Sequence, residues 1–272
     1  MAMVASLVDR ADVPQAVALN SVTFNLARAI GPITAAAVIA AYGPSVAFAV
    51  NAGSFVLFVG ALLVIRPRPQ QRASRPSFRD SLELVRRNRQ LALYLLVILV
   101  ISFSTDPVNT ESPAFAHAFG FHTSWAGVVV GAFGAGAVAG AFLDAGRLTG
   151  TRRRMAVTLG LTGGGMLLFS VSPWFGLALV LLACSGCGYL LSNASATSRL
   201  QLGVEEHERG RIMALWTVAF LGIRPIASIV DGAIAGTLGV RAAGVVMAIP
   251  ALLGAAVAAN LVRVRLLQPR AS

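Results

Sequence analysis

Eight long apolar stretches divide this chain, and they constrain its fold more than any other feature. A helix needs about 20 residues to cross the hydrocarbon core of a bilayer, because each residue adds about 1.5 Å to its length. Segments that reach or approach this length lie at residues 18–41, 45–65, 91–112, 124–145, 155–172, 174–193, 212–235 and 241–262. The sequence therefore predicts an all-α membrane protein with eight transmembrane helices, held in the lipid bilayer.

The arginines lie almost entirely on one side of the predicted membrane. The chain of 272 residues has 22 basic residues, all of them arginine, and a net charge of +11. Nineteen lie at the chain ends or in the loops after every second span, whereas Arg241 alone lies in the opposite loops. Because basic loops stay in the cytoplasm, we expect an inner or plasma membrane protein with both termini cytoplasmic. The alternation argues against binding to nucleic acid, the other function that so basic a chain suggests.

Two apolar segments of the chain are similar to each other. Residues 18–43 align with residues 214–239 without a gap, at an offset of 196 and with nine identities in 26 positions. One identity pairs Arg28 with Arg224, and a charged residue inside an apolar helix is costly enough to be rare. The repeat indicates a transporter built from two related halves.

The spans and the charges predict four regions along the chain. Residues 1–65 hold the first two spans, residues 91–265 hold six more, and residues 266–272 form a cytoplasmic tail. The linker at 66–90 is rich in proline and arginine at its start and has apolar residues at helical spacing from Ser77 onward. This second part is either an amphipathic helix on the anionic inner leaflet or a plain basic loop.

Charged side chains inside the predicted spans are the candidates for a functional site. Each costs about 2.5–3.5 kcal/mol at the centre of a membrane helix, so such residues usually line a bundle interior or a wet cavity. Arg224 and Asp231 are seven residues apart and therefore share one helix face. We expect arginine–carboxylate pairs between the first, third and seventh spans. The alternative is that the arginines only anchor their helices near the cytoplasm. The predicted transport pathway consists of Arg28, Asp106, Asn109, Glu111, Arg224 and Asp231.

Four segments of the chain carry a resemblance to a known family. They read LVDRADVPQAVALNSVTFNLARAIGP, AFAVNAGSF, TDPVNTESPAFA and ERGRIMALWTVAFLGIRPIA. They resemble transporters of the major facilitator superfamily, in particular the siderophore- and macrolide-exporter branch called transmembrane secretion effectors. Members of this family have twelve helices in two halves of six, and by position the spans here match helices five to twelve.

The resemblance implies a function as well as a fold. It implies a secondary exporter that moves a small amphipathic molecule by alternating access, driven by protons and without a cofactor, in a chain that lacks the first four helices. A non-transporting eight-helix accessory protein and an inactive remnant remain the alternatives.

Two further sets of residues follow from the resemblance. Gly31 and Pro32 resemble the Gly-Pro motif on the fifth helix of antiporter-type members, where proline bends the helix. A kink with no role in coupling is the alternative. The expected helix-kink positions are Gly31, Pro32, Pro107 and Pro225. The loop after the fourth span resembles the cytoplasmic gate loop of the second half, with Asp144, Arg147 and Arg152 as its charged residues. A solvated arginine loop that serves topology alone is the alternative.

The sequence does not point to an enzyme. Cys184 and Cys187 have the spacing of a redox or metal pair, but they lie in the middle of a span, where cysteine acts as a small apolar residue. The three histidines form no group with the spacing of metal ligands. We find no motif of a catalytic nucleophile. We therefore expect no catalytic residues, no metal and no cofactor.

Overall fold

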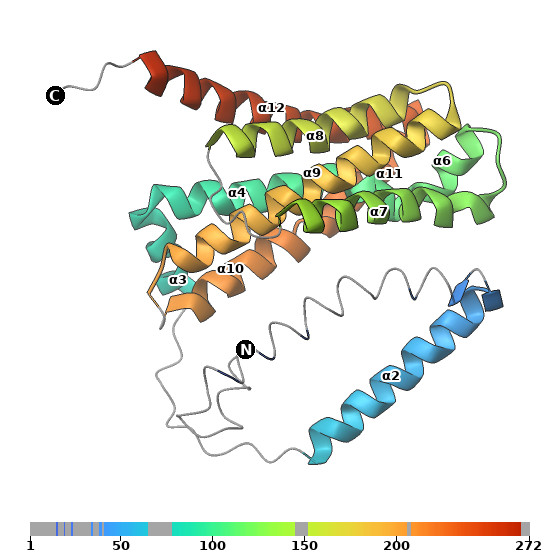
Figure 1. The fold of residues 1–272 in the computed structure, drawn as a ribbon, viewed down its shortest axis with the longest axis horizontal. Coiled ribbons are helices and arrows are strands. Elements are labelled where there is room, and N and C mark those ends of the chain that lie inside the picture. The colour runs from blue at the N-terminus through green and yellow to red at the C-terminus, as the bar shows by residue number, and fades with distance from the viewer. Residues whose placement is uncertain are drawn as a thin grey trace. The chain divides into compact units, whose positions relative to one another are not determined.

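The computed structural model describes residues 41–64, 78–144, 152–205 and 208–267, together with six single residues between positions 15 and 39. All regular secondary structure in this part is helical (Figure 1). The described elements are α2 (Pro44–Val64), α3 (Phe78–Arg87), α4 (Arg89–Ser104), α5 (Asp106–Thr110), α6 (Ser112–Ala118), η2 (Thr123–Trp125), α7 (Ala126–Asp144), α8 (Arg152–Val171), α9 (Phe175–Leu202), α10 (Arg209–Leu221), α11 (Arg224–Leu238) and α12 (Val240–Leu267).

Seven segments of the described residues are long and apolar enough to cross a membrane. The predicted number of eight is not confirmed, because the first expected span, 18–41, lies almost wholly outside the described residues. The chain forms two compact units, Met1–Arg75 and Pro76–Ser272. Of the seven spans, the first unit holds α2, which carries no charged residue, and the second unit holds the other six.

Helix α9 is the centre of the second unit. It packs against α7, α8 and α4, while α12 packs along α8 (Figure 1). Glycines bring the backbones of these helices into direct contact: a β-carbon on Gly136 of α7 would lie 1.8 Å from the carbonyl oxygen of Ala183 on α9. In the same way, a β-carbon on Gly188 of α9 would lie 2.6 Å from the carbonyl oxygen of Thr158 on α8. The hydrophobic effect does not hold helices together within a bilayer, so their packing depends on the close van der Waals contact that small residues of this kind allow.

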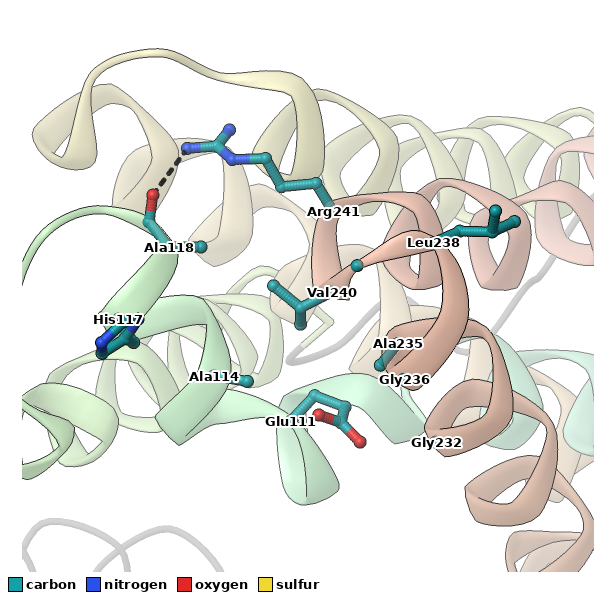
Figure 2. Close-up of a pocket in the computed structure, with 11 residues that line it drawn as sticks. Glu111, Ala114, His117, Ala118, Gly232, Ala235, Gly236, Leu238, Val240 and Arg241 are labelled. Carbon is teal, nitrogen blue, oxygen red and sulfur yellow. Dashed lines mark hydrogen bonds between the residues drawn. The ribbon is translucent and has the colours of Figure 1, made fainter.

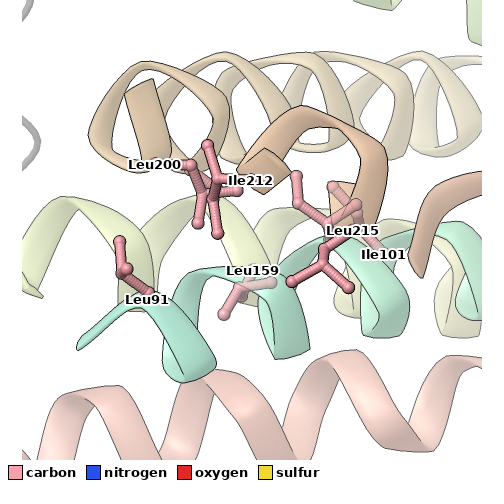
Figure 3. Close-up of a cluster of buried hydrophobic side chains, with 8 residues drawn as sticks. Leu91, Ile101, Leu159, Leu200, Ile212 and Leu215 are labelled. Atoms are coloured by element: carbon pink, nitrogen blue, oxygen red, sulfur yellow. The ribbon is translucent and has the colours of Figure 1, made fainter. Parts of the chain in front are cut away.

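Two clusters of buried apolar side chains hold the ends of this unit. The first joins α4, α8, the last turns of α9 and the first turns of α10, and Figure 3 shows Leu91, Ile101, Leu159, Leu200, Ile212 and Leu215 in it. The second joins α6, α8 and the start of α9 around Phe115 and Phe169, whose rings lie 4.7 Å apart. Buried hydroxyls link the helices between the clusters. For example, Ser185 Oγ donates to the carbonyl oxygen of Thr162 at 2.7 Å.

Helix α3 lies in the region where the sequence left an amphipathic helix or a basic loop open. It packs against α4 and α10, and its Leu84 and Val85 contact the first apolar cluster. Arg86 and Arg87 occupy its last turn and are exposed. Part of its apolar face is therefore covered by the protein itself.

Two of the predicted spans are not single helices in the structure. The span expected at 91–112 is divided at Thr105 into α4 and α5, and the chain continues into α6. The span expected at 212–235 is divided at Gly222 and Ile223 into α10 and α11. These two breaks position the candidate site.

Candidate functional site

The two broken spans meet, because α5 packs directly against α11. Pro107 stands in the first turn of α5 and Pro225 in the first turn of α11, where the N–H that proline lacks would have no helical partner. Interrupted helices in membrane proteins expose backbone groups beside cavities, and they often form binding sites there. The breaks therefore mark the most suitable place for a site in this unit.

Two hydrogen bonds between a hydroxyl and a carboxylate connect the helices after the breaks. Ser228 Oγ on α11 donates to Asp106 Oδ2 on α5 at 2.6 Å. In the opposite direction, Thr110 Oγ1 on α5 donates to Asp231 Oδ2 on α11 at 2.8 Å. Both aspartates are buried, with 2% of Asp106 and none of Asp231 exposed. Each helix thus supplies one carboxylate and one hydroxyl to a reciprocal pair.

The expected arginine–carboxylate pairing with Arg224 is not what the described residues show. The Arg224 guanidinium lies over the Phe220 ring, with Cζ 5.0 Å from the ring centre, and its Nε has no hydrogen-bond partner in this part of the chain. It acts on Asp106 only through space. The reason is geometric: helical side chains lean toward the helix N-terminus, so Arg224 leans toward the preceding turn and away from Asp231. The hydroxyl of Ser228, one turn after Arg224, binds Asp106 instead, and the hydroxyl of Thr110 binds Asp231.

An open cleft of about 670 Å³ lies beside these links, between α6, α11 and the start of α12 (Figure 2). Glu111 lies between α5 and α6 and lines the cleft, so its carboxylate is the part of the cleft wall next to the two buried aspartates. A β-carbon on Gly232 would lie 3.9 Å from Glu111 Oε1, and the charge of Glu111 repels that of Asp231. Within the described residues the Glu111 side chain forms no hydrogen bond or ion pair, so a ligand in the cleft can reach it.

Arg241, at the start of α12, lies at another wall of the cleft (Figure 2). Its Nη1 donates to the carbonyl oxygens of Ser170 at 3.1 Å and Ser172 at 2.6 Å, and its Nη2 donates to that of Ala118 at 3.5 Å. The guanidinium also lies 4.4 Å from the centre of the Phe119 ring. The carbonyl ends of helices carry partial negative charge. Arg241 therefore ties α12 to the ends of α6 and α8.

The other predicted residues that the structure describes take no part in these contacts. Asn109 is exposed, and its Nδ2 donates to the carbonyl oxygen of Thr105 in the preceding turn at 3.4 Å. Asp144 ends α7 and Arg152 begins α8, on either side of residues that are not described. The predicted residues that lie outside the described part of the chain are Arg28, Gly31, Pro32 and Arg147.

Sequence reasoning missed two polar residues at this site. Ser228 lies four residues after Arg224 and three before Asp231, so helical spacing already places it on the same face. Arg241 entered the prediction only as a charge in a loop, because the sequence does not show which carbonyl groups come near it. Among the described residues, no three histidine, cysteine, aspartate or glutamate side chains come together as metal ligands would.

Comparison with known proteins agrees with this architecture. No curated protein matches the chain. The sequence does match the model of one family, the Major Facilitator Superfamily, over residues 1–223 of 272. This is a family of membrane transport proteins, as the apolar helices and the polar site between two broken spans would suggest, and it is not a family of enzymes. The match covers most of the chain, which therefore belongs to the Major Facilitator Superfamily.

Proposed function

We propose that this chain is a secondary transporter that exports a small amphipathic molecule in exchange for protons by alternating access. The observation that carries the proposal is the meeting of two broken spans, where a hydroxyl on each helix binds a buried carboxylate on the other, next to an open cleft. Export, and membership of the siderophore- and macrolide-exporter branch, are supported by the four segments that resemble that branch.

The exchange of protons is supported by the surroundings of the Asp231 carboxylate. Its Oδ2 accepts a hydrogen bond from Thr110, whereas its Oδ1 is buried and has no hydrogen-bond partner among the described residues. A buried carboxylate inside a membrane span is costly as an anion, and a proton on Oδ1 would remove that charge. Hydroxyl groups bind an ionised carboxylate more strongly than a neutral one. Proton uptake would therefore weaken a link between α5 and α11, and proton loss would restore it.

The orientation that we propose follows from the arginines. With both termini in the cytoplasm, the turn between α11 and α12 and the segment from α6 to α7 lie on the outer side. The cleft lined by Glu111 and Arg241 then opens near the outer surface. A molecule released outward would pass this cleft last.

Transport by the purified chain in proteoliposomes tests the proposal. Three fluorescent dyes would be offered under an imposed pH gradient: ethidium as a cation, Nile red as a neutral molecule and carboxyfluorescein as an anion. We expect movement of at least one dye that requires the gradient and is lost in Asp231→Asn and Asp106→Asn. The matched control is Glu83→Gln, which changes an exposed carboxylate on α3 that pairs with Arg87. Folded protein that moves no dye under either gradient direction would contradict the proposed function.

A further inference from the structure

We infer that the cleft beside Glu111 binds the positively charged group of an amphipathic organic cation, with the Glu111 carboxylate as its counter-charge. The inference rests on the proposed function for its biological role, and it names the class of molecule that the site accepts. It is argued from the charges of the walls, the carboxylates behind them and the size and polarity of the space.

The charged and titratable residues that line the cleft are Glu111, His117 and Arg241. Arg241 would attract an anion, but its guanidinium is already bound to the carbonyl oxygens of Ser170 and Ser172 and lies against the Phe119 ring. Figure 2 shows Arg241 directed toward Ala118, whereas the Glu111 carboxylate stands apart near Gly232. Among the lining residues, Glu111 therefore supplies the negative charge that a ligand in the cleft can contact.

Further carboxylates lie behind the wall that Glu111 forms. Asp231 directly precedes Gly232 of the cleft, is fully buried and leaves Oδ1 without a hydrogen-bond partner among the described residues. Its charge repels those of Glu111 and Asp106. The nearest arginine on the same helix, Arg224, is directed to Phe220 instead. A cation in the cleft would reduce the repulsion among these carboxylates, whereas an anion would increase it.

The size and the remaining walls favour an amphipathic molecule over a simple ion. A volume of about 670 Å³ lies within the range of small-molecule sites. Ala114, Leu238 and Val240 supply apolar walls, and a β-carbon on Gly236 would meet nothing within 4 Å. The cleft thus offers an apolar surface and one carboxylate that binds no other described side chain, which match an apolar body and a charged head.

Binding of ethidium to the purified full chain in detergent, followed by fluorescence anisotropy, tests the inference. We expect Glu111→Gln to weaken ethidium binding by about tenfold or more, which is about 1.4 kcal/mol. Glu111→Asp, which keeps the charge, should retain part of the affinity. The matched control is Glu208→Gln, the same substitution at the start of α10 and outside the cleft. It should leave binding unchanged.

A second measurement, the displacement of bound ethidium, uses the unmodified chain and so does not depend on the folding of a variant. Tetraphenylphosphonium and tetraphenylborate have the same shape and opposite charges, and we expect only the phosphonium to displace ethidium. Equal displacement by both ions, equal ethidium binding by Glu111→Gln and the unmodified chain, or no ethidium binding at all would each overturn the inference. These measurements use no pH gradient. If the chain transports another dye along the gradient but does not bind ethidium, the inference alone is rejected. If the chain binds ethidium but transports no dye, the proposed function alone is rejected.

Discussion

Thr110 on α5 donates a 2.8 Å hydrogen bond to Asp231 on α11, although the two residues lie 121 positions apart in the chain. The bond between Ser228 and Asp106 runs in the opposite direction between the same two helices. The two broken spans are therefore held together by their polar side chains at the site itself. A change in either carboxylate acts on the contact between the helices as well as on any ligand.

We expect Thr110→Val to lower stability by about 1 to 2 kcal/mol, because it removes a hydrogen bond between helices and leaves buried Asp231 without its hydroxyl donor. The midpoint of thermal unfolding in detergent measures the effect. Thr237→Val is the matched control on α11, since within the part of the chain that the structure describes the Thr237 hydroxyl bonds only to carbonyl oxygens of its own helix. Equal midpoints for the two variants would show that the link contributes nothing to stability.

We expect Gly136→Ala to destabilise the contact between α7 and α9 by about 1 to 3 kcal/mol, the usual effect of overpacking. The added methyl would lie 1.8 Å from the carbonyl oxygen of Ala183, so the two helices would have to move apart. Gly134→Ala on the same helix is the control, because a β-carbon there meets nothing within 4 Å. Thermal unfolding of the two variants checks this, and a loss of stability in both would instead point to a general intolerance of α7.

The helices themselves could be predicted from the sequence, because each needs a long apolar run. Their ends could not, whereas the sequence already has prolines, Pro107 and Pro225, beside the two interruptions. Helix α9 continues to Leu202, beyond the predicted end at 193, through a polar stretch that is not typical of a span. It stays helical there because Ala196 and Leu200 are buried in the first apolar cluster. The break at Gly222 and Ile223 comes just before Pro225, which has no N–H to continue the hydrogen bonding of the preceding turn.

The charged residues of the candidate site could be predicted from the sequence, but the groups that form hydrogen bonds with them could not. Asp106 and Asp231 stood out because a carboxylate in a membrane span is costly. Which group binds them depends on the direction in which each side chain leans and on the position of the breaks. Pairs of glycines four residues apart, a spacing that lets membrane helices approach closely, have the same limit. Gly136, four residues before Gly140, lies against another helix backbone, whereas Gly127 and Gly131 meet nothing within 4 Å. Spacing identifies a shared face but not what that face contacts.

The proposed orientation can be tested by labelling introduced cysteines in whole cells, after Cys184 and Cys187 are replaced by alanine. We expect Ser124→Cys, at the exposed element η2, to react with a membrane-impermeant maleimide added outside. Glu83→Cys, at an exposed position of α3, should react only after the cells are permeabilised. The reverse pattern would show that the arginine-rich loops lie outside the cell.

Arg241 provides the last prediction, because one side chain connects α12 to the ends of α6 and α8. We expect Arg241→Lys to lower stability by about 1 to 3 kcal/mol, since an ammonium group cannot reproduce the planar fork that bonds the Ser170 and Ser172 carbonyl oxygens. Arg153→Lys, at an exposed position at the start of α8, is the control and should have no effect.

The Arg241→Lys variant also distinguishes the role of Arg241 from that of Glu111. Lysine keeps the positive charge, so Arg241→Lys should leave the preference for cations over anions unchanged while the unfolding midpoint falls. If Arg241→Lys instead abolished ethidium binding without loss of stability, Arg241 would be a ligand contact and not a connection between helices. Thermal unfolding and ethidium anisotropy, measured on the same preparation, distinguish these outcomes.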